Sequence, residues 1–378
     1  MTNLIYLIVF AVSTLLIRRA DKEKNRKKSR RIIRFCLTSI ALLLPSILAG
    51  VRDFSIGTDV LVYGNLWFEY AVSDTDFMHY VTWGTLSGID LIYCIINYIV
   101  ARFTDNVHWF YFVFSLITTG VIYKSAEDNK DIVEPYFVML AYYLLFYNQS
   151  LNMLRQSLAL VIVACSFSYI RRNQYLRFAL CAVLATLAHR SAIVVILLLI
   201  IYKIVNSQVR ILGKAIVLIG GLIALFGINY IYSAFVNIGL LTTRYESYFD
   251  TQQRGGFYVH LVLLCAPYLT LMYFFIKQRL YDKSVRDTIN GLKYYLLFSA
   301  IVGCVSIRMT YMSRIVLYFD IMLIFTVPLI ANNLSKILAI NGKNMNKIFL
   351  AMWMLVYWGI VYVIRNSGET FPFIFMIT

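Results

Sequence analysis

The residue that most clearly could do chemistry is Arg155, which lies with Asn152 and Gln156 in "NQSLNMLRQSLAL", residues 148–160, at the start of an apolar run. A planar guanidinium can hold a phosphate or carboxylate with two parallel hydrogen bonds. If this stretch is one helix, Asn148, Asn152 and Arg155 share a face, and the helix start points its positive dipole end at an anion. The pattern therefore indicates an anion site. The alternative is that Arg155 only snorkels to the lipid head-groups.

A second polar group is the pair His189 and Arg190 in "LAHRSAI", residues 187–193, between two apolar runs. The histidine is a candidate general base, and the pair is a candidate ligand of a pyrophosphate. A polar turn of a helical hairpin is the alternative.

A third group is "SIRMTYMSRIVLYFD", where Arg308 and Arg314 flank a turn that contains Tyr311. Two arginines at this spacing could embrace one diphosphate. The alternative is anchoring at the membrane interface, with tyrosines of the aromatic belt.

Acidic candidates lie near the beginning of the chain. Asp59 ends the turn Gly57-Thr58-Asp59, with Tyr63 one helical turn later and Arg52 just before. Asp59 is a candidate base, and turn formation with helix capping is the alternative. The six cysteines show no CxxC pair and no nearby histidine, and the motif Asp74-Thr75-Asp76 is discounted as a metal site, so no metal is expected.

The elements that must position these residues are membrane helices. Hydrophobic residues make up 60% of the chain and charged residues only 14%, which leaves too little polar surface for a soluble globule. Runs of about 17–25 apolar residues recur from end to end, each able to cross the bilayer. We expect an all-α polytopic protein, one transmembrane domain over residues 1–378.

Charge sets the orientation. The loop 18–34 holds ten Lys or Arg, and further basic loops lie at 171–177, 203–214, 277–293 and 336–347. The positive-inside rule places these in the cytoplasm and explains the net charge of +16 without nucleic acid. The long loops 51–86 and 230–256, the tail after Ile364 and the polar groups above then face outward. Because the rule gives no reason for arginines there, they indicate an anionic partner.

One stretch breaks this alternation. Between two outward points near residues 55 and 150 the number of crossings must be even, yet three apolar runs occur, at about 86–103, 107–123 and 134–148. Either the run 86–103 lies in the interface as an amphipathic helix, or residues 60–80 re-enter the membrane. We expect 12–14 crossings in all.

Four segments carry a family resemblance. "VRDFSIGTDVLVY", "LNMLRQSLAL", "LATLAHRSAIVVI" and "SRIVLYFDIMLIF" resemble, in order over roughly residues 50–330, segments of the EpsG family of Wzy-type polysaccharide polymerases. The "RQ" segment is the most specific of them. The chain departs from the family pattern at Ala188, where an aromatic residue is usual, and at Arg190.

The resemblance implies a multi-pass enzyme of the bacterial inner (cytoplasmic) membrane, with its active site facing the periplasm. The implied fold is a GT-C-like bundle with short helices in its periplasmic loops. Such an enzyme transfers a growing glycan, O-antigen or another surface polysaccharide, from undecaprenyl diphosphate onto the non-reducing end of another lipid-linked repeat unit. No metal or cofactor is expected. Lipid-linked repeat units, membrane lipids and a chain-length regulator are the expected partners.

The resemblance also suggests roles for the residues. Diphosphate binding falls to Arg155, Arg308, Arg314 and, less directly, Arg52. His189 or Asp59 takes the acceptor proton, and Arg155 acts in catalysis. The residues expected to line the substrate are Asn152, Gln156, Arg190, Tyr311 and Tyr63. Two alternatives stay open: a flippase or transporter of lipid-linked oligosaccharides, which needs a charged cavity open to both sides, and a GT-C transferase or ligase with another donor or acceptor.

Overall fold

A computed structural model describes residues 4–24, 30–208, 256–275, 282–306, 310–334 and 343–376, together with the single residues 215, 219 and 227. The chain divides into two compact units. The first comprises Met1–Ile193, Val327–Asn332 and Ile340–Thr378, and the second comprises Val194–Thr326 and Asn333–Ala339. The predicted single transmembrane domain stays a prediction, and each unit is described by itself.

The first unit is built from helices. They are α1 (Ile5–Lys24), α2 (Arg31–Gly50), η2 (Val60–Asn65), α3 (Leu66–Ser73), α4 (Phe77–Leu86), α5 (Leu91–Ala101), α6 (Val107–Asp128), α7 (Pro135–Tyr142), η3 (Tyr143–Tyr147), α8 (Asn148–Asn152), α9 (Leu154–Arg171), α10 (Tyr175–Ala188), α20 (Lys343–Trp358) and η9 (Gly359–Ile364). A short η4 (Arg190–Val194) follows α10, and the unit boundary runs through it and through α19 (Leu323–Leu334).

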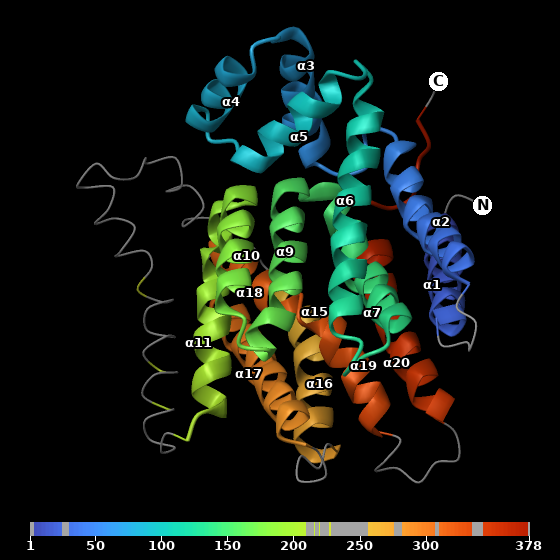
Figure 1. Cartoon of the computed structure of the whole chain (residues 1–378), viewed down its shortest axis with the longest axis vertical. Helices are drawn as coiled ribbons and strands as arrows, with labels where there is room; N and C mark the ends of the chain where they lie inside the picture. The colour runs from blue at the N-terminus through green and yellow to red at the C-terminus, as the bar shows by residue number, and fades with distance from the viewer. Residues whose placement is uncertain are drawn as a thin grey trace. The chain divides into compact units, whose positions relative to one another are not determined.

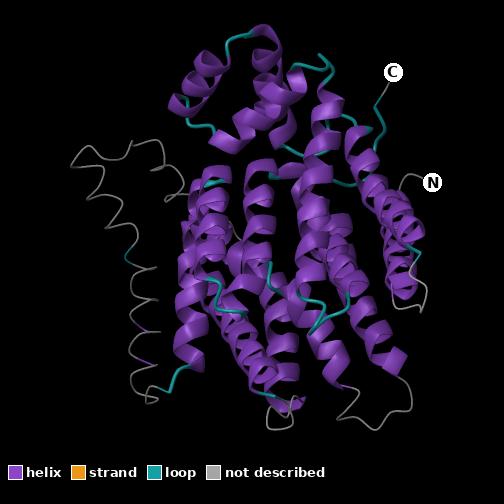
Figure 2. Ribbon diagram, in the orientation of Figure 1, coloured by secondary structure: helices purple, strands orange, loops and turns teal. Residues whose placement is uncertain are grey.

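The second unit is also helical. It contains α11 (Val195–Asn206), α15 (Gly256–His260), η6 (Leu261–Cys265), α16 (Ala266–Thr270), η7 (Leu271–Phe275), α17 (Lys283–Ser306) and α18 (Thr310–Asp320). The described residues contain no strand, only an isolated bridge between Arg52 and Phe375. The ribbon of the described residues consists of helices joined by loops (Figure 2). The chain is an all-α polytopic membrane protein, as the sequence predicts.

Four helical stretches of the described residues are long and apolar enough to cross a membrane: Arg31–Gly50, Lys283–Ser306, Met312–Leu334 and Met345–Ile364. Other apolar stretches are divided by π-helical turns, as in residues 135–152. The number of 12–14 crossings stays a prediction.

The structure indicates which of the three apolar runs between residues 55 and 150 does not cross the membrane. Helix α5 has 11 residues, which span about 16 Å at 1.5 Å per residue, roughly half of a hydrocarbon core. It packs with α3 and α4 beyond the end of α9 and beside the first part of α6, forming a lobe of short helices (Figure 1). Helix α6 has 22 residues and is long enough to cross. This supports the alternative in which the run 86–103 does not cross.

The helix predicted over residues 148–160 is interrupted. Met153, with φ −89° and ψ 65°, separates α8 from α9. Asn148 is fully buried, where its side chain bonds Trp358 Nε1 at 2.8 Å and Thr370 Oγ1 at 3.1 Å. The prediction that Asn148, Asn152 and Arg155 share one helical face is therefore wrong, because packing against the C-terminal segment holds Asn148 inside and a break follows Asn152.

Within the first unit, α2 ends, α6 begins, α9 begins and α10 ends at the same side (Figure 1). The segment after η9 lies there too, since Asp53 N donates to Ile374 O and Met376 N donates to Val51 O, both at 2.9 Å. The ends predicted to face outward are thus together. A buried aromatic cluster of Tyr6, Phe10 and Tyr147 packs below them.

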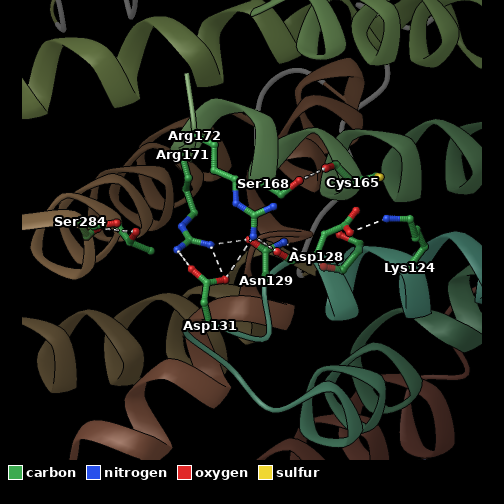
Figure 3. A network of polar contacts seen from close by, with 11 residues as sticks. Lys124, Asp128, Asn129, Asp131, Cys165, Ser168, Arg171, Arg172 and Ser284 are labelled. Carbon is green, nitrogen blue, oxygen red and sulfur yellow. Dashed lines mark hydrogen bonds and ion pairs between the residues drawn. The ribbon is translucent and has the colours of Figure 1, made fainter. Parts of the chain in front are cut away.

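The opposite end of the same unit carries the basic termini of the helices. Arg171 makes a forked ion pair with Asp131, at 2.6 and 3.3 Å, and donates to Asn129 Oδ1 at 2.8 Å (Figure 3). Arg172 donates to the backbone carbonyl of Asp128. Burial raises the pKa of Asp131, but the hydrogen bond and charge of Arg171 outweigh this and lower it below the ordinary value. Helix α9 therefore carries Arg155 in its first turn and the pair Arg171 and Arg172 at its other end.

Candidate functional site

One carboxylate oxygen joins two of the predicted site residues. Asp90 Oδ2 lies 3.2 Å from Arg155 Nη1 and 3.1 Å from His189 Nδ1. Three elements bring them together: Asp90 precedes α5, Arg155 is in the first turn of α9, and His189 follows α10. The structure therefore places Arg155 and His189 at one site, although 34 positions separate them in the sequence.

The three side chains are largely enclosed. The exposed fractions are 4% for the Asp90 side chain, 19% for Arg155 and 16% for His189. Buried charges persist when they are paired and hydrogen-bonded, and removing one partner strands the other. The geometry holds the arginine and the imidazole in fixed positions and leaves both with a small open edge.

Arg155 has two further contacts. Its Nη1 donates to Gly88 O at 3.4 Å, and its guanidinium carbon lies 4.7 Å from the centre of the Tyr63 ring. Stacking on an aromatic face fixes the plane of a guanidinium. Within the described part of the chain the hydrogen bonds of Arg155 use Nη1 alone, so Nη2 and Nε–H remain for a ligand. The role of Tyr63 in lining the substrate stays a prediction.

Asn152 connects the first outward loop to the break between α8 and α9 by hydrogen bonds. Its Oδ1 accepts hydrogen bonds from Thr58 Oγ1 and from Asp59 N, both at 3.0 Å. Gly57 allows the approach: its φ is +96°, and a Cβ there would lie 2.9 Å from Leu151 O. Asp59 is thereby held beside the beginning of α9, and a role for Asn152 in lining substrate stays a prediction.

Arg52 is completely buried. Its Nη1 donates to Leu151 O at 2.6 Å, and its guanidinium carbon lies 4.3 Å from the centre of the Tyr111 ring. In a continuous helix a carbonyl accepts from the N–H four residues later; here the arginine side chain serves the carbonyl at the break. The diphosphate contact expected of Arg52 stays a prediction. In the structure, Arg52 stabilises the break between α8 and α9 through its hydrogen bond to Leu151 O.

The remaining predicted residues belong to both units or lie outside the described residues. Gln156 is buried and Arg190 is exposed. Arg314 and Tyr311 belong to α18 of the second unit, and Arg308 lies outside the described residues. The convergence of these arginines with Arg155 stays a prediction.

The sequence analysis did not select Asp90 for the site. The signal that identifies it is an acid immediately before a helix in an outward, largely apolar stretch, where an ionised group needs a partner.

The second unit holds a polar cluster that the sequence analysis also missed. Asp320 Oδ1 accepts a hydrogen bond from Ser299 and lies 3.5 Å from His260 Nε2. Cys265 Sγ lies 3.1 Å from the same nitrogen. No group of three or more His, Cys, Asp or Glu with the geometry of a metal site occurs among the described residues. Asp320 is the last residue of α18, and further apolar residues follow it in the chain.

A family model matches the chain. The model of the EpsG family matches residues 34–375, nearly the whole chain. No curated protein and no solved structure matches it.

Proposed function

This chain belongs to the EpsG family of Wzy-type polysaccharide polymerase-like membrane proteins, and from that membership we propose that it polymerises a surface polysaccharide such as O-antigen. The donor is a growing glycan on undecaprenyl diphosphate, and the acceptor is the non-reducing end of another lipid-linked repeat unit. The reaction takes place at the periplasmic face of the bacterial inner membrane.

The observation that carries the proposal is the carboxylate of Asp90, which holds both Arg155 and His189. Glycan transfer from a diphosphate needs a fixed cation where negative charge develops and a base near the acceptor hydroxyl. A preorganised donor in an enclosed site contributes about 3 kcal/mol to such a transition state. Arg155, oriented by Asp90 and by the Tyr63 ring, supplies that donor through Nη2 and Nε–H.

His189 is the base in this proposal. A carboxylate at Nδ1 orients the ring and favours the tautomer with the lone pair on Nε2. The bond between the glycan C1 and the diphosphate oxygen breaks, and a bond between C1 and the acceptor oxygen forms. The acceptor proton passes to His189 Nε2, and undecaprenyl diphosphate leaves with the electron pair. Asp59, whose backbone N donates to Asn152 Oδ1 beside the beginning of α9, is the second candidate base.

The test uses purified full-length protein in nanodiscs with lipid-linked repeat units alone. A ladder of longer glycans is expected without nucleotide sugar, ATP or added metal. Arg155→Ala should abolish the ladder, and Arg155→Lys should restore it only in part, because an ammonium lacks the planar fork.

Arg172→Ala is the matched control, because Arg172 caps the other end of the same helix and lies in the network of Figure 3. Chain growth by this control should equal that of the unsubstituted protein. A protein that makes no ladder, or an Arg155→Ala variant with full chain growth, would refute the proposal. Transfer of a single glycan to a different acceptor would indicate a ligase instead.

A further inference from the structure

The lobe of short helices carries an open cavity that is separate from the residues around Asp90. The cavity has a volume of about 400 Å³ and is lined by Tyr70, Ser73, Asp74, His79 and Trp83. Sites for small molecules have volumes of about 300–1,000 Å³. The lining therefore combines two aromatic rings with a hydroxyl, a carboxylate and an imidazole in a space large enough for a ligand.

The aromatic rings stand at the surface of the lobe. Trp83 is 39% exposed and Tyr70 is 37% exposed, while Trp67 beneath them is only 7% exposed. The Tyr70 and Trp83 ring centres are 4.8 Å apart with the planes at 83°, and the Trp67 and Trp83 centres are 4.9 Å apart. The buried Trp67 fixes the two outer rings, so they present firm apolar walls at right angles.

The polar side of the cavity is fixed as well. His79 Nδ1 lies 2.6 Å from Asp74 Oδ2, and Asp74 Oδ1 accepts from Asp76 N at 3.0 Å. Asp76 in turn caps α4 by accepting from the backbone of Met78 and His79. A carboxylate offers about four lone-pair sites, so Asp74 can accept further hydrogen bonds from a ligand.

Arg102 holds the turn between α3 and α4 through hydrogen bonds to its backbone. Arg102 Nη2 donates to Asp74 O at 3.3 Å and to the carbonyl of Ala71. Its guanidinium stacks on the Tyr98 ring at 4.4 Å, and the Tyr98 hydroxyl donates to Thr75 O at 2.5 Å. A site that is ordered before binding loses less entropy when the ligand arrives.

We propose that this cavity binds a saccharide, as a subsite for the glycan of a lipid-linked unit. One face of a sugar ring presents C–H groups that pack on an aromatic ring, and the rim presents hydroxyls that pair with carboxylate, imidazole and hydroxyl groups. None of the five lining side chains is Lys or Arg, and one is an acid, which disfavours a phosphate or an anionic head-group. The assignment of the sugar to a lipid-linked unit rests on the proposed function.

The experiment is saturation-transfer NMR on the full-length protein in nanodiscs. The probe is the repeat-unit oligosaccharide freed of lipid and diphosphate by mild acid. Ring C–H protons of the sugar should receive saturation from the protein, and Trp83→Ala should weaken binding about 10-fold, the loss expected for one aromatic contact. Trp109→Ala is the matched control, since Trp109 is 56% exposed at the start of α6 but does not line the cavity.

Glycerophosphoethanolamine serves as the second probe, to represent a lipid head-group. Saturation of this probe without saturation of the oligosaccharide would overturn the proposal, as would equal binding by Trp83→Ala and the unsubstituted protein. Arg155→Ala should keep oligosaccharide binding while losing chain growth. A protein that binds the oligosaccharide through Trp83 but makes no ladder would therefore refute the proposed polymerase and uphold the saccharide site.

Discussion

Asp90 Oδ2 lies 3.2 Å from Arg155 Nη1, and both side chains are largely enclosed. The pair joins the lobe of short helices to the first turn of α9. Since His189 contacts the same oxygen, the position of the arginine and the orientation of the imidazole depend on a single carboxylate.

Asp90→Asn should therefore lower chain growth about 100-fold, because the amide keeps the shape but loses the charge that orients both partners. Steady-state rates with lipid-linked units measure this. Arg155→Lys keeps part of the chain growth, and the double variant Asp90→Asn/Arg155→Lys should lose less than the sum of the two single losses in transition-state free energy, because residues that act as a unit are not additive. The exposed Asp105 of the loop before α6 supplies the control Asp105→Asn. Fully additive losses would show that Asp90 does not act through Arg155.

Gly57→Ala should destabilise the protein by about 1–3 kcal/mol, since Gly57 has φ +96° and its Cβ would lie 2.9 Å from Leu151 O. Thermal unfolding in detergent measures the change. Gly120→Ala in α6 is the matched control. Nothing lies within 4 Å of the added Cβ, so the better helix propensity should stabilise by about 0.5–1 kcal/mol. Equal shifts for the two variants would contradict the close approach at Gly57.

Arg52→Met should destabilise the protein by about 1–3 kcal/mol, because Leu151 O loses its 2.6 Å donor inside the protein. Arg52→Ala should cost more, since it also leaves a cavity. Urea or thermal unfolding ranks the three proteins. A methionine variant as stable as the unsubstituted protein would show that this hydrogen bond is not needed at the helix break.

The pair His79 and Asp74 should make the turn between α3 and α4 sensitive to pH. The hydrogen bond and charge of Asp74 raise the pKa of His79, and the hydrogen bond from His79 lowers the pKa of Asp74. The stabilisation from His79 is complete below its ordinary pKa and is lost as pH rises through the raised value. The stabilisation from Asp74 is complete above its ordinary pKa and is lost as pH falls through the lowered value.

The stabilisation by the pair is thus largest between about pH 4 and 6.5, the ordinary pKa values of the aspartate and the histidine. NMR titration of labelled histidines measures the His79 pKa, and Asp74→Asn should return it toward its ordinary value. His108, which contacts Gly50 O at 2.9 Å on another element, should titrate the same in both proteins. A His79 titration unchanged by Asp74→Asn would contradict the pairing.

Hydrophobic runs and charge patterning predicted the helical membrane fold. A run that crosses the lipid must satisfy its backbone N–H and C=O groups within itself, and a helix does this. The same patterns did not predict the break at Met153. No proline or glycine lies there, and the break depends on Asn148 bonding Trp358 and on Arg52 bonding Leu151 O, contacts between residues far apart in the chain.

The candidate site was predicted in part. Arg155 and His189 stand out in sequence because each is a polar group between apolar runs, and the structure brings them together. Asp90 does not stand out in the same way, since its importance comes from geometry. Only the packing of α5 against α10 and the ion pair with Arg155 show that Asp90 contacts both residues.

The segment after η9 has a consequence for biosynthesis. Gly57 N donates to Glu369 O, Tyr6 donates to Thr370 O, and Met376 N donates to Val51 O. A chain is made from its N-terminus. The loop that carries Gly57 therefore cannot form its hydrogen bond to Glu369 O until the ribosome has added more than 300 further residues. Insertion of the early helices and fixing of this loop by the C-terminal segment are therefore separate events in time.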